Sequence, residues 1–289
     1  MDNMDMVISS RRRAKPASEP VPEPMTDGGV PAYEETETVE SEPTETDAPV
    51  VPIIALDHVS KSFPGGYPAL DGLHLTILPG EFVTLVGASG AGKSTLLKLI
   101  YAEETPTSGA VLFNGRDLTT INRKHLPYYR RNIGTVFQDF KLLPQKTAYE
   151  NIAYALEVYG KPTEDIQNEV PQILELVDLE GKAGNLPKQL SGGEQQRVAI
   201  ARALILQPKI IIADEPTGNL DPVSAEGIIN LLLEINQLGT TVILATHNQG
   251  LVDKIGRRVI LLDHGRIASD EMVGRYVTSE AEPRRRAVV

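Results

Sequence analysis

The sequence predicts an α/β fold with an antiparallel β subdomain and a helical subdomain. Residues 82–86 form an apolar, β-rich run like a buried parallel strand, and a glycine-rich turn joins them to residues 94–100, which have helical spacing. Two further apolar runs, 53–59 and 73–77, have the pattern of paired antiparallel strands. Residues 139–190 are mainly helical in their pattern. Together these observations indicate a parallel core with two attached parts.

The elements follow in order from Ile53. Pro64-Gly65-Gly66 predicts a turn between the first two strands. After residues 94–100, strands are expected at 110–113 and 133–137. The helical part then shows two apolar faces with helical spacing, and Pro171 interrupts the second, which predicts a kink or a helix start there. The two faces are Tyr149, Ile152, Ala153 and Leu156, and Ile166, Val170, Ile173, Leu174 and Val177.

The second half of the chain predicts an alternation of helices and strands. A helix is expected at 194–206, and an apolar strand ends at Asp214. Pro222 suits the first position of a helix that runs to Leu238 and stops at Gly239. Strands at 241–245 and 258–262 complete the α/β core.

The segment GASGAGKST, from Gly87 to Thr95, matches the pattern G-x-x-x-x-G-K-S/T. In such a loop the backbone amides surround phosphate groups, the lysine reaches the β and γ oxygens and the hydroxyl holds Mg²⁺. Because a strand precedes the loop and a helix follows it, phosphate would lie at a helix N-terminus. The sequence therefore predicts a nucleotide site built from Gly87, Ser89, Gly90, Ala91, Gly92, Lys93, Ser94 and Thr95, with Ser94 also a metal ligand.

A second motif, LSGGEQQ, spans 190–196. Ser191, Gly192, Gly193 and Glu194 open another predicted helix and so provide a second helix end that attracts anions. Taken alone, Ser-Gly-Gly is more often a linker or a cap. One nucleotide has little use for two such ends in one subunit, whereas two chains arranged head to tail can close both motifs around one ATP. The sequence thus predicts an ATP-dependent homodimer.

With IIIADE ending at Glu215, these motifs resemble the ATP-binding cassette (ABC) family over about residues 53–275. The resemblance implies an ATPase with a P-loop core of ABC type. It also implies that Phe63 stacks on adenine, although Tyr67 is close enough to compete. Gln138 would touch Mg²⁺ and the attacking water, and Asp214 would hold the metal.

The same resemblance assigns three more residues. Glu215 would be the general base, and His247 would contact the γ-phosphate. Asp221 belongs to the loop that crosses the dimer interface and is counted with the nucleotide-binding residues. Each has an ordinary structural alternative: a carboxylate after an apolar strand is usually a solvated strand end, and a lone histidine is usually structural.

Composition and charge limit the possible functions further. The chain has no cysteine, which excludes disulfides and zinc–thiolate sites, and no apolar stretch of about 20 residues that would span a membrane. Residues 1–52 contain 12 acidic and 4 basic side chains and 8 of the 21 prolines, so they predict a disordered acidic arm. The ATPase domain is expected at 53–278 and a basic tail at 279–289.

Several classes of ABC protein are excluded by what the chain lacks. The 42 residues after His247 leave no room for a regulatory domain, and the 97 residues between Lys93 and Ser191 are too few for a long coiled coil. No tandem basic face for nucleic acid is present. A cytoplasmic subunit held at the inner face of the cell membrane by an integral membrane partner is the expected class.

Within that class, FQDFKLLPQKTAYENIAYALEV at 137–158 and DEPTGNLD at 214–221 resemble a subgroup with three kinds of member. These are a cell-division ATPase and the ATPases of lipoprotein-releasing and macrolide-type extrusion complexes. SGAGKSTLLKLI at 89–100 resembles the cell-division member most. The resemblance implies a partner that transmits conformational change to regulators of cell-wall hydrolases. A transport ATPase and a soluble ATP-dependent factor are the alternatives.

Overall fold

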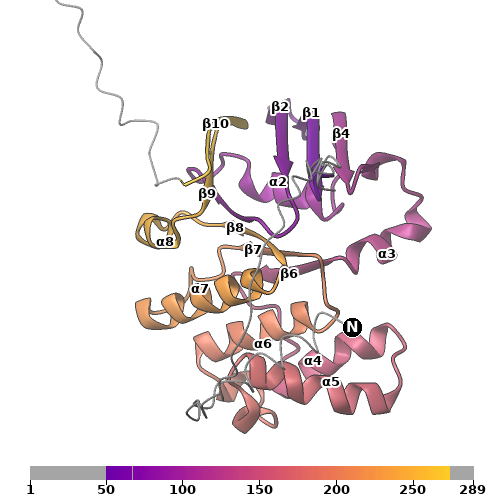
Figure 1. Cartoon of the computed structure of the whole chain (residues 1–289), viewed down its shortest axis with the longest axis vertical. Helices are drawn as coiled ribbons and strands as arrows, with labels where there is room; N and C mark the ends of the chain where they lie inside the picture. Colours follow the sequence, from indigo (N-terminus) through magenta and orange to yellow (C-terminus); the bar gives the residue numbers. More distant parts are fainter. Residues whose placement is uncertain (1–49, 67, 274–289) are drawn as a thin grey trace, which may run out of the picture.

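The computed structural model describes residues 50–66 and 68–273. Residues 1–49 of the predicted acidic arm, the basic tail 279–289 and Tyr67 lie outside these ranges. The described chain forms two sheets with helices beside them, as Figure 1 shows.

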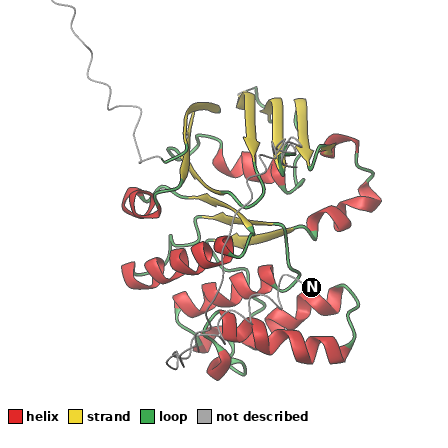
Figure 2. Cartoon of the chain, in the orientation of Figure 1, coloured by secondary structure: helices red, strands yellow, loops and turns green. Residues whose placement is uncertain are grey.

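The first sheet is antiparallel and lies at one end of the molecule (Figures 1 and 2). Its strand order is β2-β1-β4-β5. Ile54 pairs with Ile77 on one side and with Phe113 on the other, and the turn at 64–66 joins β1 to β2 as predicted. The antiparallel β subdomain is thus confirmed. Its strands are β1 (Ile54–Ser62), β2 (Pro68–Ile77), β4 (Ser108–Phe113) and β5 (Arg116–Asp117).

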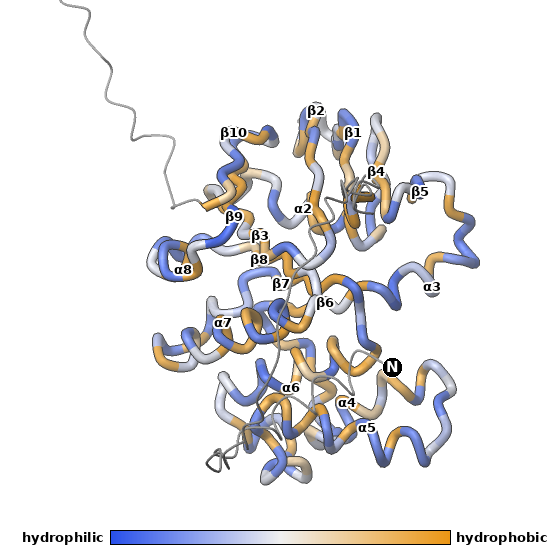
Figure 3. The backbone as a smooth tube through the Cα atoms, viewed as in Figure 1, coloured by the Kyte–Doolittle hydropathy of each residue, from blue (hydrophilic) through white to orange (hydrophobic). Residues whose placement is uncertain are grey.

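The second sheet has the order β10-β9-β3-β8-β7-β6 and is parallel except at β10. All five residues of β3 and of β8 are buried, as expected for strands covered on both faces. Figure 3 shows the corresponding hydrophobic run through the centre of the molecule. The strands are β3 (Phe82–Val86), β6 (Ile133–Phe137), β7 (Ile210–Asp214), β8 (Thr241–Ala245), β9 (Arg258–Asp263) and β10 (Arg266–Glu271).

The strand register brings the predicted site residues to one edge of this sheet. Phe137 lies opposite Asp214, and Asp214 lies opposite Ala245. Leu85 is also paired with Ala245, so the loop after β3 starts at the same edge. Because parallel strands share their carboxyl edge, the residues that follow β3, β6, β7 and β8 are neighbours.

The helical subdomain lies at the opposite end of the molecule from the antiparallel sheet (Figure 1). Its apolar faces are buried as the spacing predicted, with Ile152, Leu156 and Val170 all fully covered. No helix in the described ranges is both long and apolar enough to cross a bilayer. The helices are α2 (Lys93–Ile100), α3 (Leu126–Arg130), α4 (Ala148–Val158), α5 (Thr163–Leu176), α6 (Gly192–Leu204), α7 (Pro222–Gln237) and α8 (Gln249–Ile255).

The prediction that a helix starts at Pro171 is wrong, because α5 begins at Thr163 and runs through the proline. Pro171 is exposed, and so is Gln167, whose carbonyl loses its helical hydrogen bond to the proline. Water can bind that carbonyl. Val170, Ile173 and Leu174 are buried on the other face, and their burial outweighs the lost bond.

Candidate nucleotide-binding site

The loop between β3 and α2 requires glycine at its first and last positions. Gly87 and Gly92 have φ of 151° and 109°. A Cβ at Gly87 would lie 2.3 Å from the carbonyl oxygen of Leu262, and one at Gly92 would lie 2.7 Å from that of Ala69. Either contact is too short, so the sequence pattern reflects close backbone packing around the loop.

Lys93 is a buried cation at the start of α2. Its Nζ donates hydrogen bonds to the carbonyls of Gly87 at 2.7 Å and Ala88 at 3.1 Å. The ammonium group therefore lies across the mouth of the loop, where phosphate oxygens are strong alternative acceptors.

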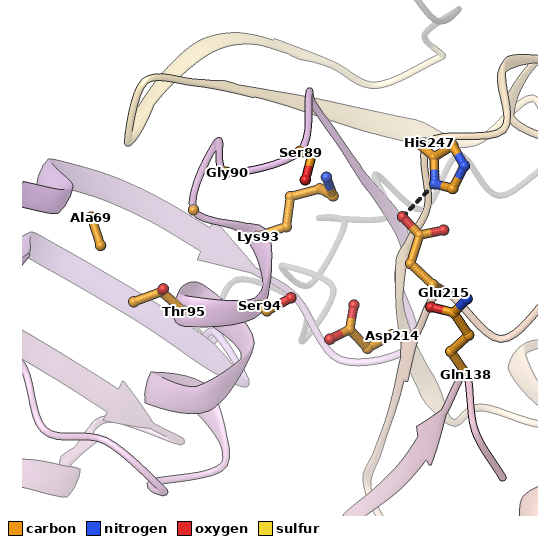
Figure 4. A pocket seen from close by; sticks show the side chains of 11 residues that line it. Ala69, Ser89, Gly90, Lys93, Ser94, Thr95, Gln138, Asp214, Glu215 and His247 are labelled. Atoms are coloured by element: carbon orange, nitrogen blue, oxygen red, sulfur yellow. Dashed lines mark hydrogen bonds and ion pairs between the residues drawn. The ribbon is translucent and has the colours of Figure 1, made fainter. Parts of the chain in front are cut away.

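A pocket of about 520 Å³ opens beside this loop (Figure 4). It lies at the carboxyl edge of the parallel sheet, the usual location of ligand sites in such folds. Side chains from β7 and the segments after β6 and β8 face the loop across it. The lining residues are Ala69, Ser89, Gly90, Gly92, Lys93, Ser94, Thr95, Gln138, Asp214, Glu215 and His247.

Asp214 ends β7 and faces Ser94 across the pocket (Figure 4). Burial raises the pKa of the Asp214 carboxyl above its usual range, the hydrogen bond with Ser94 opposes that shift, and the charge of Glu215 adds to it. A carboxylate and a hydroxyl are the hard oxygen ligands that Mg²⁺ prefers. The pair therefore fits a magnesium ion carried by a nucleotide.

This raised pKa predicts a stability effect. With a folded pKa above the unfolded value, ionised Asp214 costs folding free energy, and the cost appears as pH rises past about 4. Asp214→Asn is expected to raise the melting temperature of the nucleotide-free protein at pH 7, with the gain shrinking towards pH 4. Asp263→Asn, at the end of β9, is the control. An unchanged melting temperature for Asp214→Asn at pH 7 would contradict the burial argument.

Glu215 and His247 form a contact pair beside Asp214. The Oε1 of Glu215 lies 2.7 Å from Nδ1 of His247, with the glutamate mostly buried and the histidine largely exposed. Glu215 has a left-handed φ of 50°, and its backbone N–H donates to the carbonyl of Ala245 at 2.9 Å. A non-glycine residue in this region is strained, and such residues concentrate at functional sites.

Gln138, the residue after β6, is hydrogen-bonded to the loop that precedes α7. Its Nε2 donates to Oδ1 of Asn219 at 3.2 Å, and Nδ2 of Asn219 donates back to the Gln138 carbonyl at 3.2 Å. A Cβ on Gly218 would lie only 2.7 Å from Nε2 of Gln138. The absence of a side chain at Gly218 thus lets the loop pack against the glutamine amide.

The same segment is also held from α6. Arg202 donates to the carbonyls of Lys141 at 2.7 Å and Phe140 at 3.0 Å, and both acceptor residues have left-handed φ. Burial lowers the pKa of the Arg202 guanidinium. Gln196, fully buried on α6, donates to the carbonyl of Phe137 at 3.4 Å. Two side chains of one helix therefore fix the backbone on both sides of Gln138.

The second motif caps α6 and lies apart from the pocket. Ser191 Oγ accepts from the N–H of Glu194 at 3.3 Å, and the Glu194 carboxylate accepts from the N–H of Ser191 at 2.8 Å. Glu194 also pairs with Lys182. In the described part of the chain, the pocket lining does not include Ser191, Gly192, Gly193 or Glu194.

Asp221 and Phe63 also lie outside the pocket lining that the described residues form. Asp221 caps α7, and hydrogen bonds from Ser224 hold the pKa of its carboxyl below the usual range. The Phe63 ring is 39% exposed, with Nζ of Lys61 5.0 Å from its centre. Gly87 and Ala91 shape the loop without lining the pocket.

Some site residues were missed by the sequence reasoning. Ala69 lines the pocket, and Asn219, Gln196 and Arg202 hold the Gln138 segment. Asn219 lies inside the quoted stretch GNLD and Gln196 inside LSGGEQQ, so their motifs offered a signal. Ala69 and Arg202 belong to no motif, so the sequence offered no signal for them.

Comparison with known proteins agrees with this geometry. Residues 70–218 match the ABC transporter family. The chain is 53% identical over 224 residues to the cell division ATP-binding protein FtsE of Bacillus subtilis, covering 78% of this chain and 98% of that protein. It is 52% identical over 225 residues to FtsE of Mycobacterium tuberculosis, with the same coverage, and 46% identical over 215 residues to FtsE of Escherichia coli, covering 74% and 97%.

Solved structures show the same similarity. A dimeric post-hydrolysis state of the ATP-binding cassette MJ0796, bound to ADP and Pi, superposes with a TM-score of 0.69 at 38% identity, covering 77% of this chain and all of that one. The structure of cbiO1 from Clostridium perfringens, part of the ABC transporter complex cbiONQ, gives 0.71 at 32% identity, covering 76% and 88%. Fold, pocket and relatives agree: this chain belongs to the ABC transporter ATPase family and is an FtsE-like ATP-hydrolysing cassette.

Proposed function

We propose that this chain is the ATPase subunit of a cell-division complex, and that it acts on an integral membrane partner resembling FtsX to regulate cell-wall hydrolysis. The observation that carries the proposal is that the chain covers 97–98% of several proteins named as the cell division ATPase FtsE, at 46–53% identity. The partner would hold it at the inner face of the membrane.

Within this function, Ser94 and Asp214 would hold Mg²⁺ with the nucleotide, and Gln138 would complete the set. The ion would supply charge that stabilises the phosphate oxygens. Lys93 and the loop amides would orient the triphosphate. Glu215 would accept the proton of the attacking water, and His247, in contact with it, would keep its carboxylate in place.

The position of the second motif supports a head-to-tail homodimer. Ser191 and Gly192 open α6, a 13-residue helix whose N-terminal end can attract phosphate. In the part of the chain that the structure describes, neither residue lines the pocket of its own chain. A second copy would bring its α6 to the first pocket. The MJ0796 cassette is described as dimeric in two solved structures.

Ser191→Arg is expected to abolish ATP-dependent dimerisation while leaving ATP binding intact. The long cation would fill the space where the backbone must approach phosphate. Sedimentation velocity of a hydrolysis-deficient form, with and without ATP, measures the assembly. Thr147→Arg is the matched control, because Thr147 also forms a capping box, with Glu150, at the start of α4. If the hydrolysis-deficient protein without the Ser191 change has the same mass with and without ATP, the ATP-dependent dimer is contradicted.

Identification of the membrane protein that copurifies with the full chain tests the partner. A protein with four membrane spans and an external domain but no solute path supports the division function. A transporter subunit would instead favour a lipoprotein-release or macrolide-type ATPase. Recovery of the chain without any membrane protein would favour a soluble ATP-dependent factor.

A further inference from the structure

One segment of the described chain is strongly basic although the whole chain carries a net charge of −11. Residues 113–132 contain five lysines and arginines and only one carboxylate. That carboxylate, Asp117, accepts a hydrogen bond from the N–H of Thr119 at 2.8 Å. We call this region the basic surface; its cations are Arg116, Arg123, Lys124, Arg130 and Arg131, all exposed.

The charges of the basic surface are not neutralised by the rest of the fold. No ion pair joins any of the five to another residue within 50–66 or 68–273. Among the described residues, Arg130 donates to two backbone carbonyls, those of Tyr101 and Ala102. Arg131 lies 4.8 Å from the ring centre of Tyr128 and 4.1 Å from that of Tyr159. The surface therefore attracts an acidic ligand.

A groove of about 720 Å³ runs along this surface. Its lining includes the apolar side chains of Phe113, Leu118 and Ile121 and the exposed Tyr128. Arg116 is the one of the five cations that lines it, together with His125 and the carboxylate of Asp117. Such a groove suits an extended peptide that has carboxylates together with a few apolar side chains.

The described chain begins beside this groove. The N–H of Asn114 donates to the carbonyl of Ile53 at 3.1 Å, and a Cβ on Gly115 would lie 3.8 Å from Cγ1 of Val51. The next residue, Arg116, lines the groove. The chain preceding Val50 is therefore tethered next to the basic surface.

The preceding sequence has the complementary chemistry. Residues 33–49 contain seven carboxylates and no lysine or arginine, with Tyr33 and Val39 among them. At about 3.3 Å per residue, such a segment spans up to roughly 55 Å when extended, which is enough to follow the surface. We propose that residues 33–49 bind the basic surface and its groove of the same chain.

Two physical effects favour this occupant over a separate acidic peptide. The short tether makes binding intramolecular, with an effective concentration in the millimolar range. Seven carboxylates meeting five cations that form no ion pair among the described residues also make many weak ion pairs at once. Both effects act without a folded structure in the segment.

Disulfide formation in the full chain tests this directly, because the chain has no cysteine of its own. Ser41→Cys is combined with His125→Cys on the basic surface or with Thr240→Cys as the control. Thr240 lines a different hollow that also includes Ile53, Asn114 and a single cation, Lys209, so it lies near the same tether in a hollow that none of the five cations lines. Each rate is divided by the rate at which the same surface thiol reacts with a small maleimide.

The intrachain disulfide with Cys at 125 is expected to form at least about tenfold faster than that with Cys at 240, a difference of ~1.4 kcal/mol. The two rates should converge in about 1 M salt, which shortens the screening length to ~3 Å. Arg123→Glu with Lys124→Glu should have the same effect as salt. Circular dichroism and ATP hydrolysis confirm that each variant is folded.

Two results would overturn the proposal. Equal normalised rates at 125 and 240 in low salt would show that the segment has no preference for the basic surface. Disulfides formed mainly between chains would identify a second copy as the occupant.

Discussion

A protein carrying Glu215→Gln is expected to hydrolyse ATP about 10²- to 10⁴-fold more slowly than the parent while binding ATP with the same affinity. The amide keeps the size of the side chain and its contact with His247, but it cannot accept the proton of the attacking water. Asp214 and Lys93, which in the proposed function would hold the metal and the phosphates, remain unchanged.

Single-turnover hydrolysis and equilibrium nucleotide binding separate the two effects. Glu226→Gln is the matched control, because Glu226 is an exposed glutamate that pairs only with Lys254 among the interactions described, at 3.2 Å. His247→Ala should resemble Glu215→Gln, since it removes the group that orients the same carboxylate. Turnover by Glu215→Gln within about threefold of the parent, roughly 0.65 kcal/mol in barrier, would remove Glu215 from the catalytic role.

Lys93→Ala is expected to weaken ATP binding itself, by about 10- to 100-fold, because a hydrogen bond to a charged group contributes about 1.5–3 kcal/mol. The variant removes the buried cation that lies across the phosphate loop. Binding and hydrolysis should therefore fall together, unlike in Glu215→Gln.

Titration with a fluorescent ATP analogue measures this affinity. Lys98→Ala is the control on the same helix, since Lys98 is half-exposed and pairs with Glu103. Unchanged affinity in Lys93→Ala would show that the loop amides alone hold the triphosphate.

The sequence predicted three of the parallel strands to the residue. Strands 82–86, 133–137 and 241–245 have the predicted bounds. The first and the third are buried throughout, so their sequences are mostly apolar, and the second is buried at three of its five positions. Strand β10 was missed since its sequence, RIASDE, is mostly exposed and polar. Helices α3 and α8 were missed because five and seven residues carry too little periodicity.

Some parts of the candidate site could likewise be predicted from the sequence and others could not. Residues of the phosphate loop and the strand ends were predictable because their motifs are local, and the strand register brings Gln138, Asp214, Glu215 and His247 together. The contact between Arg202 and the carbonyls of Phe140 and Lys141 spans about sixty positions in the sequence. This contact forms because α6 packs against β6, so no local sequence pattern could predict it.

Helix α6 connects the second motif to the segment that follows Gln138. It runs for 13 residues from the Ser191 cap, about 20 Å at 1.5 Å per residue, and Arg202 near its far end grips the backbone after Gln138. A helix of this length is a rigid element. In the proposed dimer, a neighbouring chain that displaced the first turn of α6 would also move Arg202 and the carbonyls of Phe140 and Lys141. Gln138 is therefore linked through α6 to the Ser191 end of the helix, which in the described chain lies outside the pocket that Gln138 lines.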